Sequence, residues 1–277
     1  QTQTWTSREL AETEQCFIAT VTEANAVAAI PIACASAAIA DRPTLGDDQA
    51  AAIASIASTV TPVGVLVGPA GTGKTFTLDG VRAAFERAGF DVIGAAPSAR
   101  AAIELEAGAS IPSRTLQSLI HRWDTGHERP GGDTLLVIDE AGMADIRTLE
   151  HAVSRQVTAG GRVLLVGDQH QLPEVGAGGG FAYAATHSSS VTELHINRRQ
   201  RDAWERDALA HLRNGDVAAA VSAYAGHDRV IVTDTNDDMV GTAVDHYLAA
   251  RAIGQRPVLL AGTNDLVDRL NVAVLDR

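Results

Sequence analysis

Short apolar runs alternate along the chain with segments that have helical periodicity. Runs rich in valine, leucine and isoleucine occur at 63–67, 91–96, 135–138 and 162–166. Helix-like segments occur at 50–58, 75–88, 113–123 and 201–213. Runs that are apolar at successive positions are typical of parallel strands buried on both faces. Their alternation with helices predicts an α/β fold built on a parallel sheet.

The pattern divides the chain into three parts. Residues 1–40 predict a helical N-terminal lead-in of two short helices. Residues 41–187 contain the four strand signals and are expected to form the first α/β domain. Residues 188–277 alternate between helical segments and strand-like runs at 230–232 and 258–261, which predicts a second, incomplete α/β domain.

The uncharged, alanine-rich stretch at 24–40 does not predict a membrane span or a signal peptide. Alanine is weakly apolar, Pro31 interrupts the run, and acidic residues such as Glu9 precede it where a signal peptide is basic. The only cysteines, Cys16 and Cys34, have no ligand-spaced Cys or His nearby and are predicted to be reduced and buried. We therefore expect no membrane segment, and a cytoplasmic location.

Composition changes this picture little. A chain of 277 residues with 45% hydrophobic content can bury a core in one or two domains. Its formal net charge of −12 excludes attraction of nucleic acid by the whole surface, although a local basic groove remains possible. Because the sequence begins with Gln1 and stops within a pattern, we expect it to be a fragment of a longer protein.

The strongest chemical signal is the segment GPAGTGKT, which matches G-x-x-x-x-G-K-[S/T] between a strand-like run and a helix-like run. Its glycines allow the backbone N–H groups to point inward, and the N-terminus of the following helix adds a positive dipole end. We therefore expect a nucleoside triphosphate here, with Lys74 at the β- and γ-phosphates and the Thr75 hydroxyl on Mg²⁺. The predicted phosphate loop consists of Gly68, Pro69, Ala70, Gly71, Thr72, Gly73, Lys74 and Thr75.

Polar residues follow two of the later strand signals. Asp139 and Glu140 come directly after the run at 135–138, where the carboxyl ends of parallel strands and the phosphate loop share an edge. Because neighbouring residues of a strand face opposite ways, Asp139 is predicted to hold Mg²⁺ and Glu140 to orient or deprotonate water. Gln171 is predicted to sense the γ-phosphate through its amide, and Asp168 to fix the same loop.

Three further segments carry weaker signals. Gln49 lies one helix ahead of the phosphate loop and offers a donor and an acceptor to an adenine edge. The loop residues Pro97, Ser98 and Arg100 could admit a phosphodiester backbone, although a helix cap at Ser98 explains part of the pattern equally well. The glycine run at 176–180 is either a hinge or a structural linker.

Two aromatic or basic features allow more than one interpretation. Trp123 is expected in the core rather than as a base-stacking platform. Arg198 and Arg199 precede a long helical segment and are either surface charge or a finger that reaches the γ-phosphate; their position alone does not decide.

Taken in order, LGDDQ, GPAGTGKT, APSARAA, VIDEAGM, GDQHQLPEV and NRRQ resemble the nucleotide-binding motifs of superfamily 1 helicases of the RecD-like group. More narrowly, the chain resembles the helicase part of conjugative relaxase–helicases of the TraA/TrwC/TraI type. The resemblance covers about residues 40–277. It implies a RecA-like P-loop NTPase core followed by the start of a second RecA-like domain. It also implies ATP and Mg²⁺, movement along single-stranded DNA, usually 5′ to 3′, and other conjugation proteins as further partners.

The resemblance agrees with the nucleotide roles given above and adds two assignments. Arg199 matches the family's first arginine finger, with Arg198 as the second choice. Thr115 and the loop at 97–100 match segments that touch the DNA backbone. The later motifs of the second domain and the relaxase nuclease are not in this sequence, so we expect these residues to bind ATP–Mg²⁺, to hydrolyse it weakly and not to unwind a duplex alone.

Two alternatives remain open at this point. The first is a P-loop kinase that acts on a small molecule, although this gives no reason for VIDEAG followed by GDQHQL. The second is a non-catalytic module in which a bound nucleotide only organises protein contacts.

Overall fold

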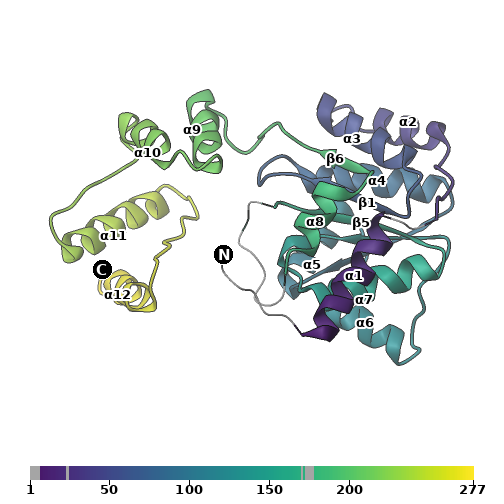
Figure 1. The fold of residues 1–277 in the computed structure, drawn as a ribbon. Helices are drawn as coiled ribbons and strands as arrows, with labels where there is room; N and C mark the ends of the chain where they lie inside the picture. The colour runs from purple at the N-terminus through teal and green to yellow at the C-terminus, as the bar shows by residue number, and fades with distance from the viewer. Residues whose placement is uncertain (1–6, 23–24, 170, 172–177) are drawn as a thin grey trace. The chain divides into compact units, whose positions relative to one another are not determined.

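The computed structural model describes residues 7–22, 25–169, 171 and 178–277. A six-stranded sheet of order β3-β2-β4-β5-β1-β6 forms its centre, and all neighbouring strands are parallel (Figure 1). The strands are β1 (Val63–Val67), β2 (Asp91–Ala96), β3 (Ser113–Thr115), β4 (Thr134–Ile138), β5 (Arg162–Gly167) and β6 (Val191–Glu193). The prediction of an α/β fold on a parallel sheet is confirmed.

Helices cover both faces of the sheet (Figure 1). On one face the core includes residues of α2 (Ile32–Ala40), α3 (Asp47–Ser58), α4 (Lys74–Arg87) and α5 (Ala99–Ala109). On the other face it includes residues of α1 (Arg8–Thr22), α6 (Leu116–Asp124), the 3₁₀ helix η1 (Ala141–Met143), α7 (Ile146–Thr158) and α8 (Gly180–His187).

The central strands supply side chains to both cores, which explains why their sequences are apolar at successive positions. In β4, Leu135 and Val137 join one core, while Leu136 and Ile138 join the other. Trp123 of α6 packs into the second core with 4% of its surface exposed. The expectation that Trp123 is a core residue is confirmed.

A buried arginine ties the segment between the first two helices to the sheet. Arg162, at the start of β5, is 5% exposed and donates hydrogen bonds to the carbonyl oxygens of Thr59 and Ala28. Its guanidinium lies over the rings of Phe85 and Phe90. The two predicted N-terminal helices are present, and burial among these groups shows that the lead-in packs directly on the α/β unit.

The cysteines differ in part from expectation. Cys16 and Cys34 are free thiols, but Cys16 is exposed and Cys34 is half-buried. The reason for Cys16 is that α1 turns Phe17 and Val21 toward the core, so the neighbouring position faces outward. In the part of the chain that the structure describes, no helix is long and apolar enough to span a bilayer.

Two short edge strands, β3 and β6, were not among the predicted elements, because a three-residue strand has too little pattern to recognise. β6 pairs with β1, so the chain continues to belong to the first sheet after residue 187. The compact unit that contains the sheet extends to Arg201, and the second unit is Asp202–Arg277. The division of the structure therefore falls later than the expected one.

The second unit contains helices, and its small core of Val240, Val244 and Leu270 comes from the last two of them. The helices are α9 (Ala203–Arg213), α10 (Val217–Gly226), α11 (Asn236–Ala252) and α12 (Asn264–Leu275). Neither run at 230–232 or 258–261 forms a strand, and Val232 and Leu260 are 88% and 89% exposed. A β-propensity run becomes a strand only when a neighbouring backbone pairs with it. That this unit begins a second RecA-like domain remains a prediction.

Candidate nucleotide site

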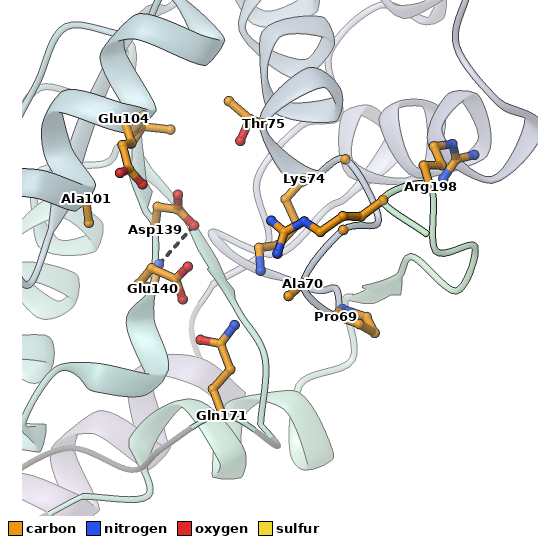
Figure 2. A pocket seen from close by; sticks show the side chains of 14 residues that line it. Pro69, Ala70, Lys74, Thr75, Ala101, Glu104, Asp139, Glu140, Gln171 and Arg198 are labelled. Carbon is orange, nitrogen blue, oxygen red and sulfur yellow. Dashed lines mark hydrogen bonds between the residues drawn. The ribbon is translucent and has the colours of Figure 1, made fainter. Parts of the chain in front are cut away.

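A cavity of about 470 Å³ opens where the loops leave the carboxyl ends of β1 and β4 (Figure 2). Ligands bind at this edge in open parallel sheets. Of the residues predicted for the site, the cavity is lined by Pro69, Ala70, Gly71, Gly73, Lys74, Thr75, Asp139, Glu140, Gln171, Arg198 and Arg199. Groups far apart in the sequence therefore meet in one concave space.

The phosphate loop has a backbone that only glycine adopts easily at two positions. Gly71 and Gly73 have φ values of +87° and +82°. A Cβ atom at Gly73 would lie 2.5 Å from Nε2 of Gln49, and one at Gly71 would lie 2.7 Å from Cβ of Arg199. Side chains from α3 and from the loop at 196–200 therefore pack closely against the phosphate loop, whose backbone has the left-handed turns that a phosphate cradle requires.

The first turn of α4 supplies the positive end of the site. Lys74 is the first residue of α4, and Gly73 before it has no side chain with which to cap the free N–H groups. The Lys74 ammonium donates a hydrogen bond to the carbonyl oxygen of Gly68 at 2.9 Å. Thr75 follows in the same turn and also lines the cavity. This arrangement fits a polyphosphate.

Asp139 and Glu140 reach the cavity by a different geometry from the one expected. They follow β4 rather than alternating within it, and Glu140 has a left-handed backbone with φ +50°. The Asp139 carboxylate accepts a hydrogen bond from the Glu140 N–H at 2.9 Å (Figure 2). The strand-alternation argument is therefore wrong, because a turn and not the strand pleat directs the two carboxylates.

Burial and, to a lesser extent, the Glu140 charge together raise the pKa of Asp139 to about 6, although the hydrogen bond from the Glu140 N–H and the Lys74 charge oppose the shift. An anionic carboxylate that is disfavoured by burial gains from a bound cation. The donor set of Asp139 and the Thr75 hydroxyl is composed of oxygen, as Mg²⁺ prefers. These residues fit the predicted metal.

One turn of α5 was missed by the sequence analysis. Ala101, Glu104 and Leu105 line the cavity, and Figure 2 shows Glu104 on the same side of it as Asp139. Their spacing of three and four residues places them on one helix face, which was the available signal. Glu104 accepts a hydrogen bond from Nε of Arg100 at 2.8 Å.

Gln49 lies behind the phosphate loop rather than among the lining residues. It is 2% exposed, and its Nε2 donates to the carbonyl oxygens of Thr72 and Gly73 at 3.3 and 3.2 Å. Its Oε1 accepts from the Gly46 N–H at 3.0 Å. Because the amide is already paired with backbone, adenine contact would require these bonds to be exchanged, and the adenine role remains a prediction.

The two adjacent arginines have different surroundings. Arg198 forms an ion pair with Asp48 and donates to the carbonyl oxygen of Thr72 at 3.0 Å. Arg199 is exposed and lines the cavity, and its guanidinium has no hydrogen bond or ion pair to any residue that the structure describes. The structure thus separates two residues whose positions in the sequence gave no preference.

The residues predicted to touch DNA lie outside the cavity lining, in the described part of the chain. Ser98 and Thr115 cap α5 and α6, because their hydroxyl oxygens accept from the N–H groups of Ala101 and Ser118, both at 3.2 Å. Pro97 and Arg100 lie at the same end of α5. Contact of these residues with DNA remains a prediction.

The loop after β5 is only partly described. Gln171 lines the cavity, and its N–H donates to the carbonyl oxygen of Asp168 at 3.2 Å. Asp168 itself is 6% exposed. The predicted hinge at 176–180 falls partly on residues 176 and 177, which lie outside the described residues.

A phosphate loop with these residues is typical of P-loop nucleotide-binding proteins, and a comparison with known families places the chain in that class. The family described as AAA domain matches residues 44–235, which is more than half of the chain. The chain belongs to this family.

Comparison with individual proteins shows which members of the family the chain resembles. The conjugal transfer protein TraA of Rhizobium radiobacter is 37% identical over 205 residues, covering 74% of this chain and 18% of TraA. The ATP-dependent RecD2 DNA helicase of Deinococcus radiodurans is 36% identical over 118 residues, covering 41% of this chain and 16% of RecD2. The resemblance to TraA-type proteins and RecD-like helicases is confirmed.

A solved structure of Pif1 helicases at forked double-stranded DNA aligns with a TM-score of 0.49 and 20% identity, covering 76% of this chain and 58% of the Pif1 chain. The matches to the two curated relatives span less than a fifth of their lengths.

Proposed function

We propose that this chain is the ATP-hydrolysing portion of a cytoplasmic conjugative DNA-transfer protein that moves 5′ to 3′ along single-stranded DNA. By itself the chain hydrolyses ATP weakly and does not unwind a duplex. One observation carries the proposal: Lys74 of the phosphate loop lines a single cavity with Asp139 and Glu140, which follow a different strand. An AAA domain with a P-loop implies nucleotide binding. The carboxylates supply what hydrolysis needs beyond binding.

Six of the cavity's lining residues then have roles in hydrolysis. Lys74 and the free N–H groups of α4 bind the phosphates, and Arg199 offers a further positive charge near them. Thr75 and Asp139 would hold Mg²⁺, which would supply positive charge to neutralise the phosphates. Glu140 accepts a proton from the attacking water, and Gln171 detects the γ-phosphate.

Helix α5 gives a physical reason for a link between DNA and nucleotide. Its first turn carries Arg100, which is available to a phosphodiester, and the next turn carries Glu104, which lines the cavity. Arg100 and Glu104 form an ion pair whose side chains are 89% and 65% exposed. A single-stranded DNA whose phosphate binds Arg100 would break this ion pair and leave the Glu104 carboxylate free beside the nucleotide. The names of two relatives, the conjugal transfer protein TraA and the RecD2 DNA helicase, support the proposal that the chain acts on DNA.

The test is steady-state ATP hydrolysis by the 277-residue chain with and without oligo(dT). We expect stimulation by the oligonucleotide, loss of nucleotide binding in Lys74→Ala, and retained binding with turnover lowered by about 10²- to 10⁴-fold in Glu140→Gln. Hydrolysis that depends on a small-molecule acceptor would favour a kinase. Nucleotide binding without hydrolysis under either condition would favour a non-catalytic module.

A further inference from the structure

The loop that carries the two arginines is held against the phosphate loop by polar contacts. The Arg198 N–H donates to the carbonyl oxygen of Gly71 at 2.7 Å. The Asn197 side-chain oxygen accepts from the N–H groups of Arg199 and Gln200 at 2.9 and 3.3 Å. The backbone on both sides of Arg199 is therefore fixed by hydrogen bonds.

The Arg198 side chain adds a second set of contacts, to the start of α3 and to the phosphate loop. It pairs with the Asp48 carboxylate through both terminal nitrogens, and the two side chains are 30% and 14% exposed. Nη1 also donates to the carbonyl oxygens of Thr72 and Ile196, both at 3.0 Å. Gly46 leaves the room for this guanidinium, because a Cβ atom there would overlap it.

Asp48 is well suited to this role. Partial burial alone would raise its pKa, but hydrogen bonds from Arg198 and from the Ile196 N–H lower it below the ordinary value. Asp48 directly precedes Gln49, whose amide holds the carbonyl oxygens of Thr72 and Gly73. In the first turn of α3, Asp48 thus holds the arginine loop (residues 196–200), and the next residue, Gln49, holds the phosphate loop.

We propose that Arg198 is a positioning residue, which clamps the loop at 196–200 to Asp48 and the phosphate loop. The clamp holds the guanidinium of Arg199, which has no partner among the described residues, at the cavity. The catalytic part of this inference rests on the proposed ATP hydrolysis, whereas the clamp itself does not. Arg199 contacts the substrate, and Arg198 acts only through Arg199.

The structure argues against the opposite assignment. If Arg198 reached the nucleotide, it would leave a partly buried Asp48 carboxylate without its partner and would give up its bonds to two carbonyl oxygens. Arg199 gives up no such contact within the described chain. Displacement of a catalytic group by about 1 Å is sufficient to cost about 10²-fold in rate.

The kinetic test is a double-mutant cycle in the 277-residue chain. Arg198→Ala is expected to lower kcat for oligo(dT)-stimulated hydrolysis by about 10²-fold with little change in KM for ATP. The same substitution in an Arg199→Ala background is expected to cost less than about threefold. Arg198→Lys, which keeps the charge for Asp48, should recover part of the rate. An equal cost in both backgrounds, or a cost confined to KM, would overturn the proposal.

A second measurement does not depend on hydrolysis. Arg199→Cys is labelled with a nitroxide in a chain that also carries Cys16→Ser and Cys34→Ser, and the label's mobility is recorded by electron paramagnetic resonance. Adding Arg198→Ala or Asp48→Asn should increase that mobility, while thermal unfolding stays within a few degrees of the labelled parent. Unchanged mobility in both variants would overturn the clamp.

The matched control is Arg87→Ala, which removes an ion pair with Asp41 that lies outside the cavity lining in the described residues. It should change neither kcat nor label mobility. If the parent chain does not hydrolyse ATP, the proposed function fails, and the mobility measurement still decides whether Arg198 positions the residue that follows it.

Discussion

At the scale of single residues, two independent constraints make glycine necessary at position 73. The backbone has a φ of +82°, and the space that a Cβ atom would occupy is filled by the Gln49 amide. Gly89, after α4, has a similar φ of +89° but open space around it. Comparing Gly73 with Gly89 therefore separates the free-energy cost of a left-handed backbone from the cost of placing a Cβ atom in occupied space.

We predict that Gly73→Ala and Gly89→Ala each lose about 1 kcal/mol of unfolding free energy because of the left-handed backbone. Gly73→Ala should lose about 1–2 kcal/mol more, because the Gln49 amide must move from the two carbonyl oxygens it holds. Its affinity for a fluorescent ATP analogue should fall by about tenfold, while that of Gly89→Ala should not change. Urea unfolding and fluorescence titration measure both. Equal affinities in the two variants would contradict the bracing role of Gln49.

Glu140 is a residue whose side chain could be predicted from the sequence and whose backbone conformation could not. Its identity and its place after an apolar run predicted a carboxylate at the sheet edge, and the structure has one there. The backbone that directs it, with φ +50°, is uncommon for a residue with a side chain and has no local sequence signal. Chemistry was therefore predictable at this position, whereas conformation was not.

At the scale of elements, α4 is held in place by ion pairs as well as by its apolar face. Asp79 accepts hydrogen bonds from Nε of Arg42 at 2.7 Å and from Nη2 of Arg82 at 2.6 Å. The three side chains are between 13% and 21% exposed. Since the same helix begins at Lys74, this network fixes the element whose N-terminus forms the site.

We predict that this network makes stability depend on acid pH. Partial burial opposes the charge of Asp79, but hydrogen bonds from Arg82 and Arg42 hold its pKa below the ordinary 3.8. A carboxyl group with a lowered pKa in the folded state stabilises the fold above its unfolded pKa and stops doing so as pH falls through the folded value. Asp79→Asn should therefore lose about 1–3 kcal/mol at pH 7 and progressively less below pH 3.8. Thermal unfolding across this range measures the gap; a gap at pH 3 as large as that at pH 7 would contradict the prediction.

The short edge strand β6 could not be predicted from the local sequence pattern. β6 adds to the sheet beside β1 with three residues, and this pairing draws the arginine loop onto the phosphate loop. A segment that short is recognised as a strand only by its partner. The same reasoning explains the runs at 230–232 and 258–261, which have strand-like composition and no strand in the structure.

At the scale of the whole molecule, the candidate site belongs to one unit. Its lining residues lie between Pro69 and Arg199, and the unit that contains them is Gln1–Arg201. The second unit has a small core of Val240, Val244 and Leu270. Nucleotide binding should therefore not require the second unit.

We predict that residues 1–201 alone bind a fluorescent ATP analogue with an affinity within about threefold of the 277-residue chain. The reason is that all of the cavity's described lining residues are retained. Fluorescence titration of both chains is the measurement, with thermal unfolding as the control for folding of the shorter one. Binding weaker by more than about tenfold would mean that the second unit contributes to the site.

The sequence by itself determined the features that depend on neighbours along the chain. Apolar runs specified β1, β2, β4 and β5, and the G-x-x-x-x-G-K-[S/T] pattern specified a loop between β1 and α4. The acids after β4 followed from their place at the end of a strand. Each of these is local chemistry: side-chain periodicity, glycine freedom and a helix N-terminus.

Only the tertiary structure decided which groups meet across long separations. It turned Gln49 toward the loop backbone, brought Glu104 into the cavity, and paired Arg198 with Asp48 across 150 residues of sequence. Such pairings arise when the sheet brings distant loops to one edge, and burial there selects partners for groups that water would otherwise satisfy. That is why Arg198 and Arg199, which their position alone does not distinguish, have different surroundings in the fold.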